Sequence, residues 1–163
     1  MTLVLVTGAP GTGKTTLAHA LAGTIGCPLI GRDQVRVGVV HAGTPDEGYL
    51  HTFDTFFRVV QVLARGGVTA VVEAAFQDRL WRPRLASLAA LAPLRIVRCA
   101  PPPGVIRARI AARMAADAAH DDADLLARPK PWEPPVTDAP TLVVDTSDGY
   151  RPSLAAIAEF AFA

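Results

Sequence analysis

Runs of apolar residues recur along the chain, and stretches with helical spacing separate them. The apolar runs lie at residues 2–7, 28–30, 68–72, 94–99 and 141–144. They do not alternate with polar residues, and continuous apolar runs of this length are typical of strands that are buried on both faces of a parallel sheet. The pattern therefore predicts five strands in one sheet that helices cover on both sides.

Helical patterns fill the intervals between these strands. We expect helices at residues 13–23, 34–40, 50–65, 78–91, 103–119 and 152–162. The third of them is the clearest, because its apolar residues recur at helical spacing until Gly66 and Gly67 end it. Alternating strands and helices predict an α/β fold with a parallel, doubly wound sheet. Ligands of such sheets bind beyond the carboxyl ends of the strands, so the residues that follow each strand are the functional candidates.

Length and composition set bounds on the class of protein. The 163 residues suit a single domain, which we expect to span 1–163, and half of them are hydrophobic. A net charge of +1 gives no general signal for nucleic acid or for a membrane surface. Cys27 and Cys99 lack zinc-site spacing and are expected to be buried thiols in a reducing compartment. The first apolar run is too short for a signal peptide or a membrane span, so we expect a soluble, cytoplasmic protein.

The most informative motif follows the first strand. Residues 8–15 read Gly-Ala-Pro-Gly-Thr-Gly-Lys-Thr and fit G-x-x-x-x-G-K-T, the phosphate-binding loop of P-loop NTPases. In this loop the glycines let backbone N–H groups face a phosphate, Lys14 reaches the β and γ oxygens, and the Thr15 hydroxyl holds Mg²⁺. A strand before the motif and a helix after it disfavour the alternative, a chance glycine-rich turn. The predicted nucleotide-binding residues here are Gly8, Pro10, Gly11, Thr12, Gly13, Lys14, Thr15 and Thr16.

Acidic residues follow the second and third strands. Asp33 is a candidate general base that takes a proton from an acceptor hydroxyl, and Arg36 lies on the same helical face, where it can position that acceptor. Alternatively, Asp33 is only a helix N-cap. Glu73 ends the third strand and is a candidate for orienting the water shell of Mg²⁺ or for holding the acceptor hydroxyl. The alternative for Glu73 is a solvated strand end.

The last two strands lead into further candidates. Arg109 and Arg113 share one face of the predicted helix at 103–119, where Arg113 is a candidate for stabilising the transferring phosphoryl group and Arg109 for binding the nucleotide. A solvated basic face is the alternative. Asp145 lies in a loop that we expect to border the nucleotide base, although a plain turn would have the same composition. The segment at about 113–135 has the character of a lid.

Four further residues have no assigned role at this stage. His41 and His51 flank a loop, but their spacing indicates neither a metal site nor a catalytic triad, and we expect structural or solvent-facing side chains. Trp81 and Trp132 fit a place in the core and a place against a ligand equally well. The oligomeric state is not predicted.

With these residues in place, the chain resembles the small P-loop kinases grouped around polynucleotide 5′-kinase, chloramphenicol phosphotransferase and zeta-toxin-like kinases. The resemblance is sharpest at residues 8–15 and at Arg32-Asp33-x-x-Arg36. It implies a three-layer P-loop NTPase fold with a small helical lid, Asp33 as the general base, Arg36 at the acceptor phosphate and Arg113 as a lid arginine. The acidic strand end of this group is usually an aspartate, whereas here it is Glu73, which is one methylene longer.

These features predict an ATP-dependent kinase, with ATP and Mg²⁺, that transfers the γ-phosphate to a hydroxyl of a nucleoside, sugar or antibiotic. A net charge near zero and the lack of a long basic stripe favour a small-molecule acceptor over a polynucleotide. One alternative is a polynucleotide 5′-hydroxyl kinase, which the Arg32-Asp33-x-x-Arg36 match supports. The other is a nucleotide-binding switch or an ATPase without a kinase acceptor. A membrane partner is not expected.

Overall fold

Five parallel strands form the sheet at the centre of the molecule, in the order β2-β3-β1-β4-β5. A computed structural model of the chain describes residues 1–41, 43, 50–116 and 132–163. The strands are β1 (Leu3–Thr7), β2 (Leu29–Gly31), β3 (Ala70–Glu73), β4 (Leu94–Cys99) and β5 (Thr141–Val144). Each predicted strand is therefore present, with its ends shifted by at most two residues.

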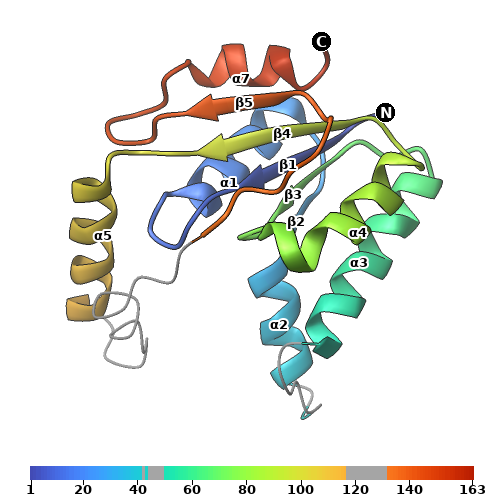
Figure 1. Cartoon of the computed structure of the whole chain (residues 1–163), viewed down its shortest axis with the longest axis horizontal. Helices are drawn as coiled ribbons and strands as arrows, with labels where there is room; N and C mark the ends of the chain where they lie inside the picture. The colour runs from blue at the N-terminus through green and yellow to red at the C-terminus, as the bar shows by residue number, and fades with distance from the viewer. Residues whose placement is uncertain (42, 44–49, 117–131) are drawn as a thin grey trace.

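Helices cover both faces of this sheet (Figure 1). They are α1 (Lys14–Ile25), α2 (Arg32–His41), α3 (Leu50–Arg65), α4 (Asp78–Ala89), α5 (Pro103–Ala116) and α7 (Leu154–Phe160). The predicted three-layer α/β fold is confirmed, whereas most of the predicted lid at 113–135 lies outside the described residues. Within the described ranges, none of the helices combines the length and apolar character needed to cross a membrane.

The core has two parts, one on each face of β1, whose five residues are all buried. Leu3 and Leu5 face a cluster that α3 and α4 supply, and Val4 and Val6 face a cluster that α1 and α7 supply. Successive residues of a strand point to opposite faces, so a run of five apolar residues can serve both clusters at once. This is the physical reason why the strand sequences do not alternate.

Trp81 belongs to the aromatic core between α3 and α4. Its ring centroid lies 4.5 Å from that of Phe76 and 4.7 Å from that of Phe53, both in edge-to-face geometry, and its side chain is 4% exposed. Such pairs contribute about 0.5–1.5 kcal/mol each beyond the burial of their area. The packing favours the core interpretation of Trp81, and the same ring also reaches a surface pocket described below.

Several helix boundaries differ from the prediction by one or two residues, and for two of them the local reason is clear. The first helix continues past Gly23 to Ile25 and ends where Gly26 takes a φ of 74° and donates its N–H to the carbonyl of Ala22. Glycine adopts this left-handed conformation at little cost, so Gly26 is the stop signal. The second helix begins at Arg32, two residues early, so Asp33 lies within its first turn and is not the N-cap.

The cysteines are both free, and they differ in exposure. Cys99 is buried as predicted, whereas Cys27 is only half-buried. Burial raises the pKa of the Cys99 thiol to about 12, which keeps it protonated and unreactive at neutral pH. The thiols are therefore packing groups.

Candidate active site

The predicted phosphate-binding loop lies between β1 and α1, at the carboxyl edge of the sheet (Figure 1). Gly13 precedes the first helical residue with a left-handed φ of 79°, and no side chain caps the helix there. A Cβ on Gly8 would lie 2.5 Å from Thr12 Oγ1 and 2.8 Å from the carbonyl oxygen of Cys99, so this position has no room for a side chain. The N–H groups in the first turn of α1 have no intrahelical acceptor, and an anion can bind them.

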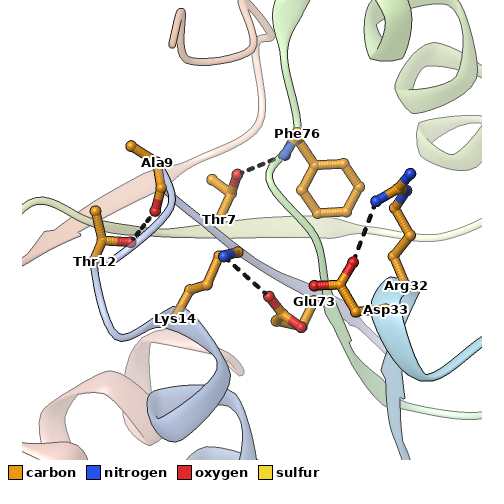
Figure 2. A network of polar contacts seen from close by, with 8 residues as sticks. All are labelled: Thr7, Ala9, Thr12, Lys14, Arg32, Asp33, Glu73 and Phe76. Carbon is orange, nitrogen blue, oxygen red and sulfur yellow. Dashed lines mark hydrogen bonds and ion pairs between the residues drawn. The ribbon is translucent and has the colours of Figure 1, made fainter. Parts of the chain in front are cut away.

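Thr12 holds the loop in shape from within. It is buried, its hydroxyl donates to the carbonyl of Ala9 at 2.8 Å, and its own carbonyl accepts the Thr146 hydroxyl at 2.6 Å (Figure 2 draws the first of these contacts). The side chain of Thr12 is therefore committed to the loop, and any contact with a nucleotide falls to its backbone. Gly8 and Pro10 likewise lie in the loop and do not line the hollow above it.

A hollow of about 230 Å³ lies over the loop. Its walls are Gly11, Gly13, Lys14, Thr15, Thr16, Arg109 and Arg113. The structure thus brings the two arginines of α5 to the phosphate-binding loop, as the sequence predicts. Three cationic side chains around one small hollow make a site for a strongly anionic group.

A second hollow, of about 360 Å³, adjoins the first and shares Gly13, Thr16 and Arg109 with it. Its other walls are the residues of the loop between β5 and α7, namely Thr146, Ser147, Asp148, Gly149 and Tyr150. Because the two hollows share three residues, they are direct neighbours. One is cationic, and the other offers an aromatic ring and backbone groups.

Arg109 joins α5 to the loop after β5. Its guanidinium donates to the Thr146 hydroxyl at 3.3 Å and to the carbonyl of Ser147 at 3.3 Å, and it also bonds to the carbonyl of Thr146. Since both hollows include Arg109, the side chain forms the wall between them. The alternative of a solvated basic face is therefore wrong for Arg109.

Asp145 shapes the turn beside this space and does not line it. Its carboxylate accepts the backbone N–H of Ser147 at 2.8 Å and also the Ser147 hydroxyl, and these hydrogen bonds hold the pKa of Asp145 below its ordinary value. The Asp145 backbone pairs with Arg151. The structure therefore favours the plain-turn interpretation of Asp145, and the residues after it border the hollow.

Glu73 lies beside Lys14, with 3.8 Å between Glu73 Oε1 and Lys14 Nζ (Figure 2). It is the last residue of β3 and is 3% exposed, so the alternative of a solvated strand end is wrong. Burial raises the pKa of Glu73, and the neighbouring ammonium of Lys14 partly opposes that shift. In the described part of the chain, Glu73 Oε1 is buried without a hydrogen-bond donor. An unsatisfied buried oxygen costs about 1–3 kcal/mol, so this position favours an incoming donor or cation.

Thr15 and Glu73 fit the Mg²⁺ that the motif implies. The Thr15 hydroxyl lies near the Glu73 carboxylate and opposes the rise of its pKa, so two oxygen ligands of the kind Mg²⁺ prefers lie close to each other at the end of the loop. Among the residues that the structure describes, no group of three or more His, Cys, Asp or Glu side chains forms a metal site. Mg²⁺ usually keeps several waters and binds through one or two protein groups plus substrate phosphates, so a sparse site is consistent with it.

Asp33 lies next to Glu73, because β2 pairs with β3 so that Gly31 is opposite Glu73. The charge of Asp33 contributes to the raised pKa of Glu73. Arg32 Nη1 donates to Asp33 Oδ1 at 3.2 Å, and the Asp33 side chain remains 76% exposed (Figure 2). Arg36 is half-buried one turn further along α2. An exposed carboxylate with a fixed partner, near the phosphate-binding lysine, is chemically able to accept a proton from a bound molecule.

A separate pocket of about 220 Å³ lies beside Asp33 and is called the Arg32 pocket here. Its walls come from the start of three helices and the segment after β3: Arg32, Leu50, Phe53, Ala75, Gln77, Leu80 and Trp81. The motifs in the sequence did not identify this pocket, because its residues are scattered over three segments. The available signal was that Ala75 and Gln77 follow the carboxyl end of a strand.

The remaining candidates lie outside these hollows. His41 and His51 are exposed, as predicted, and Trp132 is half-buried. A larger hollow of about 550 Å³ lies between α4 and residues 136–140, at the amino end of β4. Since none of the phosphate-binding residues lines it and ligands of parallel sheets bind at the carboxyl ends, we do not assign it to the site.

Solved structures similar to this chain include several kinases. A candidate kinase from Chloroflexus aurantiacus is 27% identical, with a TM-score of 0.79 over 98% of this chain and 92% of that one. A gluconokinase from Sinorhizobium meliloti is 20% identical, with a TM-score of 0.59 over 98% and 88% of the two chains. The APS kinase of Mycobacterium tuberculosis is 16% identical, with a TM-score of 0.67 over 99% and 97%. The last two identities are low enough that the likeness shows the fold alone.

No curated protein matches the sequence significantly. The likeness to polynucleotide kinase, chloramphenicol phosphotransferase and zeta-toxin-like kinases in particular stays a prediction, whereas a P-loop kinase-like, nucleotide-binding fold is shown. Residues 3–128 match the family model described as an AAA domain, and the chain belongs to that family.

Proposed function

We propose that the protein is an ATP-dependent kinase that transfers the γ-phosphate to a hydroxyl group of a small molecule. One arrangement carries the proposal: Lys14, Arg109 and Arg113 surround a single hollow, the carboxylate of Glu73 lies beside the same lysine, and Asp33 lies next to Glu73. Phosphoryl transfer needs cations around the transferring group and a base next to the acceptor. The structural relatives named gluconokinase and APS kinase support a small-molecule acceptor.

In this proposal the phosphates of ATP occupy the cationic hollow, and the nucleoside occupies the adjoining hollow beside Tyr150. The first-turn N–H groups of α1 and the Lys14 ammonium hold the β- and γ-phosphates. Thr15 and Glu73 are the residues that would hold Mg²⁺, which would supply positive charge to offset the charge of the phosphates. The Lys14–Glu73 contact then gives way to contacts with the nucleotide.

The transfer step uses the residues on the other side of Lys14. Asp33 takes the proton of the acceptor hydroxyl, the oxygen forms a bond to the γ-phosphorus, and the bond from that phosphorus to the β–γ bridging oxygen breaks to release ADP. Arg32 orients the Asp33 carboxylate, and Arg36 positions the acceptor. Arg113 and Lys14 stabilise the negative charge on the transferring group.

A transfer screen with γ-labelled ATP and Mg²⁺ tests the proposal. The panel contains nucleosides, 5′-hydroxyl oligonucleotides, sugars, sugar acids, aromatic alcohols and hydroxylated antibiotics. Asp33→Asn is the test variant, and Asp54→Asn, which changes another exposed aspartate at a helix remote from the loop, is the matched control. We expect label on one class of small molecule with the wild type and the control, and its loss in Asp33→Asn.

Other outcomes of the screen contradict the proposal in different ways. Label that appears only as free phosphate, equally in wild type and Asp33→Asn, would favour an ATPase or a nucleotide-dependent switch. Label on oligonucleotides alone, with binding that weakens steeply as salt increases, would favour a polynucleotide 5′-hydroxyl kinase.

A further inference from the structure

Two exposed leucines form part of an apolar wall in the Arg32 pocket. Leu50 begins α3, and Leu80 lies in the first turn of α4. They are 67% and 60% exposed, yet both line the same hollow. Phe53 and Trp81 line it too, and their rings are held in the aromatic core. Single exposed leucines are common on protein surfaces, but two that face one pocket with aromatic rings form a surface for an apolar ligand.

Polar side chains are few among the described residues of this pocket. Of the seven described residues that line it, Arg32, Gln77 and the indole N–H of Trp81 are able to form side-chain hydrogen bonds, and the other four are apolar. A sugar or sugar acid has a hydroxyl on nearly every carbon, and each hydroxyl that is buried without a partner opposes binding. The same leucines and rings instead favour a body whose burial removes apolar surface from water.

The polar side of the pocket leads to the candidate base. Arg32 lines the pocket, and its guanidinium also donates to Asp33 at 3.2 Å. A ligand in the pocket therefore meets the Arg32 guanidinium at the edge next to Asp33, and the apolar side chains of Leu50, Phe53 and Leu80 line other parts of the wall. The volume of about 220 Å³ is below the range of pockets for drug-sized ligands, so the ligand that fits is compact.

We infer that the phosphoryl acceptor is a compact alcohol with an aromatic or branched aliphatic body and few further hydroxyl groups. The inference rests on the proposed kinase function and names the substrate class of the same site. Leu50 and Leu80 determine specificity for the apolar body, and Arg32 holds the hydroxyl edge near Asp33. A polyhydroxylated sugar acid, the acceptor class implied by the name gluconokinase, is disfavoured.

Binding in the absence of ATP tests the inference, because Trp81 lines the pocket and its emission reports on a ligand there. Trp132→Phe leaves Trp81 as the single tryptophan, since the chain has two. The probes are 4-(hydroxymethyl)benzoate and gluconate, each of which has a carboxylate and a primary hydroxyl, so they differ mainly in the body between the two groups. Leu50→Ser and Leu80→Ser remove the apolar wall at exposed positions. Val62→Ser is the matched control, because Val62 is 67% exposed on α3 and lies outside the pocket.

We expect 4-(hydroxymethyl)benzoate to change Trp81 emission saturably in the millimolar range and gluconate to leave it unchanged at the same concentrations. Binding of the aromatic alcohol should weaken about tenfold in Leu80→Ser and in Leu50→Ser, since each change removes a large part of a leucine contact, and should change less than about twofold in Val62→Ser. Tighter binding of gluconate, no saturable change with the aromatic alcohol, or equal binding in both leucine variants and the control would overturn the inference.

Transfer from ATP to the same two probes separates this inference from the proposed function. A protein that phosphorylates gluconate and not the aromatic alcohol is a kinase, and the inference on its acceptor is then wrong. A protein that binds the aromatic alcohol in the Arg32 pocket but transfers phosphate to neither probe nor to any member of the screen has the inferred pocket preference without the proposed kinase activity.

Discussion

The nucleotide side and the acceptor side of the site are built in different ways. The nucleotide side is one short segment, residues 8–16, whose shape depends on left-handed glycines and on internal hydrogen bonds such as that from Thr146 to the carbonyl of Thr12. The acceptor side combines side chains from the first turns of α2, α3 and α4. A loop that binds its ligand through the backbone needs the same backbone conformation, and therefore the same glycines, in any sequence. A pocket lined by side chains changes with each substitution. The difference explains why the first side has a recognisable motif and the second does not.

The two sides also differ in how completely their polar groups are satisfied. On the nucleotide side, Thr12 and Arg109 have protein partners. Where the two sides meet, Glu73 Oε1 is buried without a donor in the described part of the chain, and on the acceptor side Asp33 is mostly exposed. The nucleotide side is therefore preorganised, and the acceptor side is completed by substrates.

The largest expected effect comes from Lys14→Ala, which removes a side chain that lines the cationic hollow and contacts Glu73. We expect phosphoryl transfer to fall by about 10³-fold or more, because the charge on the transferring oxygens loses its nearest fixed cation. Initial rates with labelled ATP measure the loss. Arg58→Ala, which removes an exposed cation of α3, is the control and should keep its rate. Full activity of Lys14→Ala would mean that the loop does not act in transfer.

Asp33→Asn should impair the transfer step on the acceptor side and leave ATP binding on the nucleotide side intact. The change removes the base but keeps the size of the side chain, so we expect kcat to fall by about 10²–10³-fold while the Kd for ATP stays within about twofold. Equilibrium binding of ATP and steady-state kinetics with the acceptor measure the two quantities. If kcat is unchanged and only the stability of α2 falls, Asp33 has a structural role in the first turn.

Much of the fold was predictable because it depends on local patterns. Apolar runs located all five strands, and the glycine spacing located the phosphate-binding loop. The end of α1 was predicted at Gly23, but Gly26 ends it, because a glycine stops a helix only where the chain takes the left-handed conformation. Sequence alone does not show which of two nearby glycines does so.

The candidate site was predictable where its residues lie at a strand end or shortly after one. Lys14, Glu73 and Asp33 are close together, since parallel strands end at one edge of the sheet. The role of Asp145 was not predictable, because an aspartate in a turn binds either a ligand or the nearby backbone. In this structure its carboxylate accepts a hydrogen bond from the Ser147 N–H. Leu50 and Leu80 were not predictable as neighbours, because their proximity depends on how α3 and α4 pack.

Glu73→Gln should have an intermediate effect on activity, a loss of about 10–100-fold, as expected for a residue that orients a metal and its ligands. The exposed Glu159→Gln is the control and should keep its rate. A rate for Glu73→Gln within twofold of the wild type would remove Glu73 from the transfer step.

The same variant has a second readout in the pH dependence of stability. Because the folded-state pKa of Glu73 is raised by burial above the ordinary 4.5, the folded protein binds this proton more strongly than the unfolded chain does. The contribution of Glu73 to the free energy of unfolding is therefore present below pH 4.5 and is lost as the pH rises through the folded-state pKa. Urea denaturation should show the wild type losing stability relative to Glu73→Gln as the pH rises through this window. A constant difference between the two proteins would contradict the raised pKa.

Arg109→Lys should have the smallest effect on activity. The change alters the nucleotide side of the site only. Lysine keeps the charge but cannot reproduce the forked contacts of Arg109 with Thr146 and Ser147, so α5 is held less firmly against the loop after β5. We expect the Kd for ATP to rise by about 3–10-fold with kcat within about twofold, because a net hydrogen bond is worth about 0.5–1.5 kcal/mol. Arg107→Lys, exposed on the same helix, should leave both unchanged. A large fall in kcat with ATP binding intact would instead place Arg109 on the transferring phosphoryl group, the role proposed for Arg113, and the preorganised side would then take part in the chemistry itself.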